Sequence, residues 1–215
     1  MERTTVTFTA LLVVALCVGC GSVHAGKTTR LHPLKQYRIE YQQSGTMSGT
    51  VIQACRNWCN EQVEITDATM SMMGITQKTK TRTVTVRDKV YSVDLTTGRA
   101  TVTKNPMYER IAQQMREAGD DPEKVTQSWL DAMGFKSTGK TRNIAGETCT
   151  DYTGMNGMAT SCLTKDGLML RMETMGLVQV ATAVNRKSGG EDADYALPEN
   201  PQELQVPQFG LPGAQ

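Results

Sequence analysis

Residues 78–86 read KTKTRTVTV, and threonine occupies every second position from Thr79 to Thr85. Because successive side chains of a strand point to opposite faces, this alternation predicts a long β-strand with one solvated face. The pair Arg87-Asp88 then predicts a turn into a second strand over residues 90–95. These residues decide the fold, since strands joined by tight turns form an antiparallel sheet.

Similar strand patterns flank that hairpin, and two helical segments interrupt them. Further strands are expected at 37–41, 50–54, 62–66, 99–104, 148–153, 158–164, 168–174 and 177–185. Between the two groups, Asn105-Pro106 and Asp121-Pro122 each have the order of an N-cap and a first helical residue. The predicted fold class is therefore α+β: a single curved antiparallel β-sheet, an open half-barrel, with two helices packed on one face.

These segments predict one folded domain between two less regular ends. Residues 1–19 are expected to form a lipoprotein signal peptide, or residues 1–25 if cleavage occurs later, and residues 20–35 a tether. The half-barrel domain spans 36–186, with a helical insert at 106–134. Residues 187–215 contain four prolines and are expected to form a C-terminal tail.

The N-terminus predicts export to a membrane. An apolar run over residues 6–18 leads to Gly19-Cys20-Gly21, where a lipoprotein signal peptidase would leave Cys20 as the lipidated first residue. Cleavage after Ala25 would instead release a soluble periplasmic or secreted protein. We expect a lipid-anchored protein of the bacterial cell envelope that faces the periplasm, and Gly21 in place of an aspartate favours the outer membrane.

Composition argues against several classes of function. The formal net charge of +1 gives no electrostatic footprint for nucleic acid. Both histidines, His24 and His32, precede the domain, which excludes Ser-His-Asp and Cys-His catalysis and histidine-ligated zinc or haem within it. No catalytic residue, metal or cofactor is predicted, and the chain is expected not to be an enzyme.

Four cysteines belong to the domain, and an oxidising compartment favours disulfides. Cys149 and Cys162 lie symmetrically about an expected hairpin turn and would face one another across it. Cys55 and Cys59 bracket a turn between two strands, and a disulfide there would expose Trp58. A reducible, redox-active pair or a soft metal pair are the alternatives for Cys55 and Cys59.

The apolar positions of the sheet and helices are expected to line a groove that binds an apolar ligand such as an acyl chain, because methionine-rich surfaces adapt to such ligands. The groove residues would be Tyr37, Ile39, Tyr41, Val63, Ile65, Tyr91 and Val93 from the sheet and Met107, Ile111, Met115 and Trp129 from the helices. Two alternatives remain: an interaction or structural protein of the envelope with Trp58 as the anchor for a partner, and a thiol-redox protein using Cys55 and Cys59.

Several segments resemble an uncharacterised family of bacterial exported proteins and lipoproteins. The resemblance lies in residues 37–49, Trp58, the Met-Ser-Met-Met-Gly run at 70–74, and residues 90–98, 145–149, 162–163 and 209–212. That family is similar in architecture to the half-barrel carrier and acceptor of the outer-membrane lipoprotein sorting system, which implies an acyl-chain site between sheet and helices. Cys59 departs from the family, where this turn carries glycine, so the resemblance implies no shared role for the Cys55–Cys59 pair.

Overall fold

The strands and helices follow one another in two runs of strands separated by a helical pair. The computed structural model describes residues 30–72, 74–105, 108–119, 121–132 and 134–204. Its elements are β1 (Tyr37–Gly45), β2 (Met47–Arg56), β3 (Glu61–Met72), β4 (Ile75–Val86), β5 (Lys89–Asp94), β6 (Ala100–Lys104), α1 (Tyr108–Glu117), α2 (Pro122–Ala132), β7 (Lys136–Ile144), β8 (Glu147–Gly154), η1 (Met155–Gly157), β9 (Ala159–Leu163), β10 (Met169–Thr174), β11 (Leu177–Asn185), η2 (Asp192–Tyr195) and β12 (Gln202–Glu203).

The strands form one sheet in the order β12-β6-β5-β4-β3-β2-β1-β11-β10-β9-β8-β7. The meander β1–β6 and the meander β7–β11 meet where β1 pairs with β11 in antiparallel fashion. Among the described strands, only the two-residue β12 lies parallel to its neighbour, β6. The predicted antiparallel sheet with two helices is thus confirmed, and the sheet is open; its curvature into an open half-barrel stays a prediction.

The threonine-rich segment forms β4 and is longer than its pattern predicted. β4 pairs with β3 continuously, from Glu61 opposite Val86 to Met72 opposite Ile75. Threonine and valine favour this extended backbone because their branched side chains pack well on a pleated surface. The turn into β5 at Arg87 is also present, with a positive φ of 52° at that residue.

Two strands escaped prediction because their sequences lack the apolar alternation that marks a half-buried strand. β7 is exposed along its length except at the half-buried Ile144, and it forms by backbone pairing with β8. β12 pairs only Gln202 and Glu203 with β6. Both are edge strands, where lysine, glycine and short length are typical.

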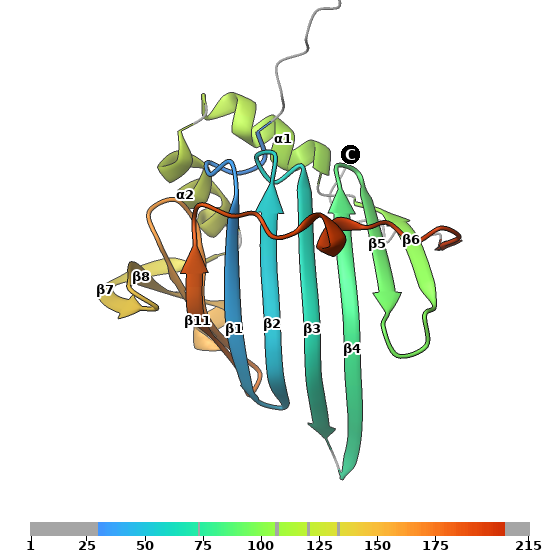
Figure 1. Cartoon of the computed structure of the whole chain (residues 1–215). Helices are drawn as coiled ribbons and strands as arrows, with labels where there is room; N and C mark the ends of the chain where they lie inside the picture. The colour runs from blue at the N-terminus through green and yellow to red at the C-terminus, as the bar shows by residue number, and fades with distance from the viewer. Residues whose placement is uncertain (1–29, 73, 106–107, 120, 133, 205–215) are drawn as a thin grey trace, which may run out of the picture.

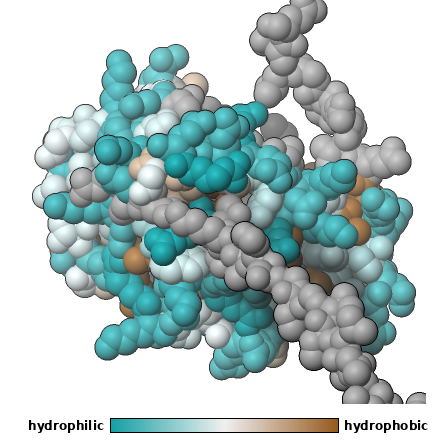
Figure 2. All heavy atoms as spheres, turned by 90° about the horizontal axis from the view of Figure 1, so that it is seen from above, coloured by the Kyte–Doolittle hydropathy of each residue, from teal (hydrophilic) through white to brown (hydrophobic). Residues whose placement is uncertain are grey.

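The two helices lie behind one end of the sheet, while the chain after β11 crosses in front of it (Figure 1). Ala112 and Met115 of α1 are buried, and Leu130 of α2 packs with Phe135 and Leu163. Seen from the helix end, the surface is mostly hydrophilic, with apolar atoms in small separate areas (Figure 2). Neither described helix has the length and apolarity needed to cross a bilayer.

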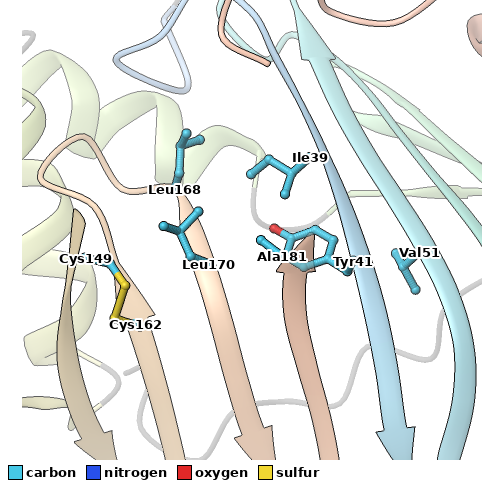
Figure 3. Packing of buried hydrophobic residues seen from close by; sticks show 8 residues of the cluster. All are labelled: Ile39, Tyr41, Val51, Cys149, Cys162, Leu168, Leu170 and Ala181. Carbon is cyan, nitrogen blue, oxygen red and sulfur yellow. A yellow bond between two sulfur atoms is a disulfide. The ribbon is translucent and has the colours of Figure 1, made fainter. Parts of the chain in front are cut away.

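The largest core cluster lies around β1, β10 and β11. It contains Ile39, Tyr41, Val51, Leu168, Leu170, Ala181 and the Cys149–Cys162 pair, all of them buried (Figure 3). The Tyr41 hydroxyl donates a hydrogen bond of 2.7 Å to the Met169 carbonyl, across the intervening β11. This half of the sheet therefore packs its apolar side chains against one another.

Candidate binding face

The register of β1–β5 fixes which side chains share a face. Ile39, Gln53, Glu64, Thr83 and Ser92 lie opposite one another on successive strands and therefore point the same way. The next row on this face contains Tyr41, Val51, Thr66, Thr81 and Asp94, and the row on the other side contains Tyr37, Cys55, Gln62, Thr85 and Val90. We call this surface of β1–β6 the threonine face.

The opposite surface is covered by the chain after β11, residues 186–204, which we call the strap; the surface beneath it is the strap face. Ala54, Val63 and Val84 lie there and form a buried cluster with Tyr195 of η2. The Tyr195 hydroxyl donates to the Gly189 carbonyl at 2.6 Å, and the Arg56 guanidinium lies 4.0 Å above its ring. The strap is thus held against the sheet over Tyr195, although residues 187–215 were predicted to be a tail.

Arg82 also fastens the strap. Its guanidinium nitrogens donate to the carbonyls of Ala193 and Ala196 at 3.0 and 2.9 Å. Tyr195 lies in a segment without apolar periodicity, so only its single aromatic side chain among polar neighbours could have indicated this contact.

The predicted groove residues of the sheet divide between these two faces, which corrects the expectation of one shared groove. Tyr37, Ile39 and Tyr41 lie on the threonine face, whereas Val63, Ile65, Tyr91 and Val93 lie on the strap face. The physical reason is that side chains alternate between the two faces of a strand. Two residues of one strand share a face when their numbers differ by an even amount, but which residues of different strands share a face depends on the register between the strands.

The helix residues of the predicted groove are only partly described. Met115 is buried and Ile111 is half-buried in α1. Met107 and the side chain of Trp129 lie outside the described part of the chain. Whether any of the eleven residues binds a ligand stays a prediction.

Two polar hollows open on the threonine face. The first, of about 220 Å³, is lined by Tyr37, Gln53, Gln62, Glu64, Thr83 and Thr85, with Ala54 and Val63. The second, of about 490 Å³, is lined by Thr81, Ser92, Asp94, Gly98, Arg99, Ala100, Thr101, Asn200 and Gln202. Because Thr81 and Thr83 are neighbours on one face of β4, the two hollows adjoin.

The polar groups of this face are arranged for hydrogen bonding. The Gln53 amide donates to the Glu64 carboxylate at 2.8 Å, which fixes both side chains at the first hollow. Burial raises the pKa of Tyr37 to about 12, so its phenol stays neutral and able to donate. Backbone N–H donors of Thr97 and Thr96 lower the pKa of Asp94, so a carboxylate stands in the second hollow.

Hydroxyls, amides and carboxylates in a shallow open hollow suit a polar ligand with many hydrogen-bonding groups. No group of three residues with metal-ligating side chains exists among those described. Sequence reasoning did not single out Gln53, Glu64 and Thr83 as candidates, because a polar strand face is typical of solvated surface. The signal was the alternation in β4, which places the threonines on one face and Lys78, Lys80 and Arg82 on the other.

Both predicted disulfides are present. The Sγ atoms lie 2.08 Å apart in Cys149–Cys162, within the core, and 2.04 Å apart in Cys55–Cys59. Asn57, Trp58 and Cys59 have φ values of 54°, 58° and 58°, three consecutive residues in the left-handed region. Glycine adopts this conformation without strain, whereas the side chains of these three residues make it unfavourable.

Trp58 holds the N-terminal segment and is half-buried, where the turn predicted an exposed side chain; its role as the anchor for a partner stays a prediction. Its backbone N–H donates to the Lys35 carbonyl at 2.9 Å, and its backbone carbonyl accepts from the Leu31 N–H at 3.0 Å. The Arg30 guanidinium lies 4.1 Å over the indole. Residues 30–35, predicted as the end of a tether, are therefore docked on the domain. Cys20 lies outside the described residues.

His32 of this docked segment lies beside Tyr37, with ring centroids 5.1 Å apart. Its Nδ1 accepts a hydrogen bond from the Leu34 N–H at 3.1 Å. Burial lowers the pKa of His32 from 6.5 to about 4, although the nearby Asp166 carboxylate acts in the opposite direction. The imidazole is therefore neutral at pH 7 and serves to pack the segment.

No protein-family model and no curated protein sequence matches the chain, so membership of the resembling family stays a prediction. Among solved structures, an uncharacterised conserved protein from Thermus thermophilus is similar with a TM-score of 0.48 and 10% identity, covering 80% of this chain and 91% of that one. PNGF-II gives 0.46 and 14%, covering 80% and 32%, and LprF from Mycobacterium bovis gives 0.35 and 10%, covering 79% and 90%. These weak similarities carry no argument about function.

Proposed function

We propose that this chain is a non-enzymatic lipoprotein of the bacterial cell envelope that is anchored through Cys20 and binds a polar ligand on its threonine face. The two disulfides support an oxidising compartment outside the cytoplasm. The apolar run before Gly19-Cys20 supports an anchored product. Docking of residues 30–35 leaves residues 20–29 as the tether between anchor and domain.

The nature of the ligand follows from where the apolar side chains are. Ile39 and Tyr41, which would have lined an acyl-chain groove, are buried against Leu168 and Leu170. Val63 is buried beneath Tyr195. The two hollows of the threonine face are lined mainly by threonine, glutamine, asparagine and carboxylate side chains, with Arg99 at the second. This lining is the observation that carries the proposal, because such groups lose hydration without compensation against an acyl chain.

The environment of His32 supports a non-enzymatic role. His32 is the one histidine in the described part of the chain, and its ring packs against Tyr37. Its neighbouring charged groups, Asp166 and Arg186, pair with each other. The first hollow contains one carboxylate, from Glu64, and this carboxylate accepts from Gln53.

The anchor is tested by growing cells that express the full chain with labelled palmitate. We expect label on the protein, and none on a Cys20→Ser variant. Unlabelled wild-type protein in the soluble periplasmic fraction would contradict the anchor.

The binding face is tested separately, with aqueous and organic extracts of bacterial envelopes, by ultrafiltration and mass spectrometry of retained molecules. We expect retention from the aqueous extract that falls in a Gln53→Leu/Glu64→Leu variant, while Lys78→Ser on the strap face changes nothing. Retention from the organic extract alone would support the acyl-chain alternative and contradict a polar ligand.

A further inference from the structure

Large apolar side chains are exposed at one set of turns. Six such residues are exposed in the described chain, and two of them, Leu197 and Leu204, belong to the strap. The other four lie at connections between strands: Ile75 (69% exposed) after the β3–β4 turn, Leu95 (39%) after β5, Met158 (61%) before β9, and Met175 (75%) between β10 and β11. We call these four residues the apolar turn ends.

The sheet topology brings the apolar turn ends to the same end of the molecule. β3 and β5 run in the same direction, since each is antiparallel to β4. Each antiparallel pairing reverses the strand direction. Four such pairings lead from β3 through β2, β1 and β11 to β10, so β10 runs in the same direction as β3, and two more lead through β9 to β8, which runs the same way. The connections that follow β3, β5, β8 and β10 therefore all leave the sheet at one end, opposite the docked residues 30–35 that precede β1. Figure 1 shows the β3–β4 turn at this end, away from the helices.

The β10–β11 turn shows that turn geometry does not explain the apolar residue. Thr174 pairs with Leu177, so Met175 and Gly176 form a two-residue turn, with φ values of 47° and 77°. This conformation favours Asn-Gly or Asp-Gly, because both central residues adopt positive φ. A methionine here adds backbone strain and exposes its side chain to water, so neither local structure nor packing favours it.

The apolar turn ends are spread over this end of the sheet and are not gathered in one pocket. The apolar turn ends lie on four separate connections, and none of them lines the two hollows of the threonine face. Separate projecting side chains can enter an interface without a shaped complement, as the apolar faces of peripheral membrane proteins do.

The charges at this end fit an anionic surface. Lys78 and Lys136 are exposed near the β3–β4 turn and at the start of β7. Lys78 and Lys80 share one carboxylate, Asp67, at 3.9 and 3.3 Å, so the lysines outnumber the acidic groups beside the β3–β4 turn. Glu173 pairs with Arg171 at 2.7 Å, and Asp94 is a carboxylate that accepts the N–H groups of Thr96 and Thr97. Exposed lysines beside apolar residues attract anionic lipid headgroups.

We infer that the apolar turn ends insert shallowly into an anionic lipid bilayer, forming a second membrane contact independent of the lipid anchor. Ile75, Leu95, Met158 and Met175 enter the headgroup region, and the sheet end with its lysines rests on the surface. The inference does not rest on the proposed function, because it needs neither lipidation at Cys20 nor a ligand on the threonine face.

The test uses the mature chain with Cys20→Ser, so that no lipid is attached, and vesicle flotation. The vesicles contain phosphatidylethanolamine and phosphatidylglycerol, with phosphatidylcholine vesicles as the neutral comparison. We expect binding to the anionic vesicles to fall about tenfold or more in an Ile75→Thr/Leu95→Thr/Met158→Ser/Met175→Asn variant. The matched control, Leu197→Ser/Leu204→Ser, removes exposed apolar residues of the strap and should bind as the parent does.

The single variant Met175→Asn keeps the test informative if the quadruple variant misfolds, because asparagine favours the backbone conformation of this turn. We expect it to unfold at the same or a higher temperature than the parent and to bind vesicles severalfold more weakly. Failure of the parent to float with anionic vesicles would overturn the inference, as would equal binding by the parent and the quadruple variant. An equal loss in the strap control would also overturn it.

Discussion

The part of the sheet around β1 and β11 differs from the part at β3–β6 in whether the side chains of the threonine face are buried or exposed at a hollow. Ile39, Tyr41 and Leu170 belong to a buried cluster in the first region, whereas the second leaves Thr83 and Glu64 at an open hollow. The two regions share one antiparallel sheet. The comparison teaches that apolar alternation in strands identifies a core, and that an uncovered polar face leaves the hollows that we propose as a binding surface.

The largest expected effect separates the two regions by stability. Leu170→Ala removes a buried side chain from the cluster and should lower the free energy of unfolding by about 2–5 kcal/mol. Thr83→Ala, on the open face, should change it by less than about 0.5 kcal/mol. Urea denaturation of both variants measures the difference. Similar values for the two substitutions would show that the regions are packed alike.

The two disulfides should also contribute unequally. Cys149→Ser/Cys162→Ser opens a link with a sequence separation of 13 residues and should cost about 3 kcal/mol, against about 2 kcal/mol for Cys55→Ser/Cys59→Ser with a separation of 4. Thermal and urea unfolding of both pairs measure these losses.

The left-handed turn offers a matched variant of the smaller disulfide. Cys55→Ser/Cys59→Gly should recover about 1 kcal/mol relative to Cys55→Ser/Cys59→Ser, because glycine adopts a φ of 58° without strain. Equal stability of these two variants would contradict the assigned backbone conformation.

The docked N-terminal segment should respond to pH. The folded pKa of His32, about 4, is below the 6.5 of an unfolded histidine, so the unfolded chain binds the proton more readily. The free energy of unfolding should therefore fall between about pH 6.5 and pH 4, by on the order of 2 kcal/mol. Urea midpoints across this range measure the effect.

His32→Gln is the control for this pH effect and should flatten the profile in that window. Burial favours the neutral form of Asp166, but hydrogen bonds from Arg186 and Thr164 lower its pKa, so its contribution is lost only at lower pH. An unchanged slope in His32→Gln would assign the pH dependence to other groups.

An effect as small as that of Cys59→Gly is predicted for the strap. Tyr195→Phe keeps the ring against Val63 and Val84 but removes the hydrogen bond from its hydroxyl to the Gly189 carbonyl. The expected loss is about 1 kcal/mol, typical of one neutral hydrogen bond. Proteolysis of the strap should become faster in Tyr195→Phe. An unchanged cleavage rate would indicate that the ring alone holds the strap.

Much of the sheet could be predicted from the sequence because most of its strands have alternating apolar and polar residues and end at recognisable turn residues. β4 and β5 alternate, and Arg87-Asp88 supplies a turn, so their pairing follows from local residues. The cysteine pairs were predictable because compartment and hairpin symmetry constrain them. β7 was not, since its stability comes from backbone pairing with β8 and its side chains carry no apolar pattern.

The candidate site was less predictable because a face is a property of several strands together. Within β3, Val63 and Ile65 clearly share one side, but their relation to Ile39 depends on the register through β2. The four residues between β2 and β3 set that register through a left-handed turn. Nothing local in the sequence reveals a turn of that kind without glycine.

The most direct test of whether the apolar residues form a filled core is native mass spectrometry of the mature domain. The domain is exported to a bacterial periplasm, purified, and measured with and without added fatty acids. The packing of Ile39, Tyr41 and Leu170 against one another predicts a protein mass without bound lipid, and no binding of added fatty acids. A co-purifying lipid of discrete mass, displaced by added fatty acid, would show that these side chains open around an acyl chain and would contradict the account.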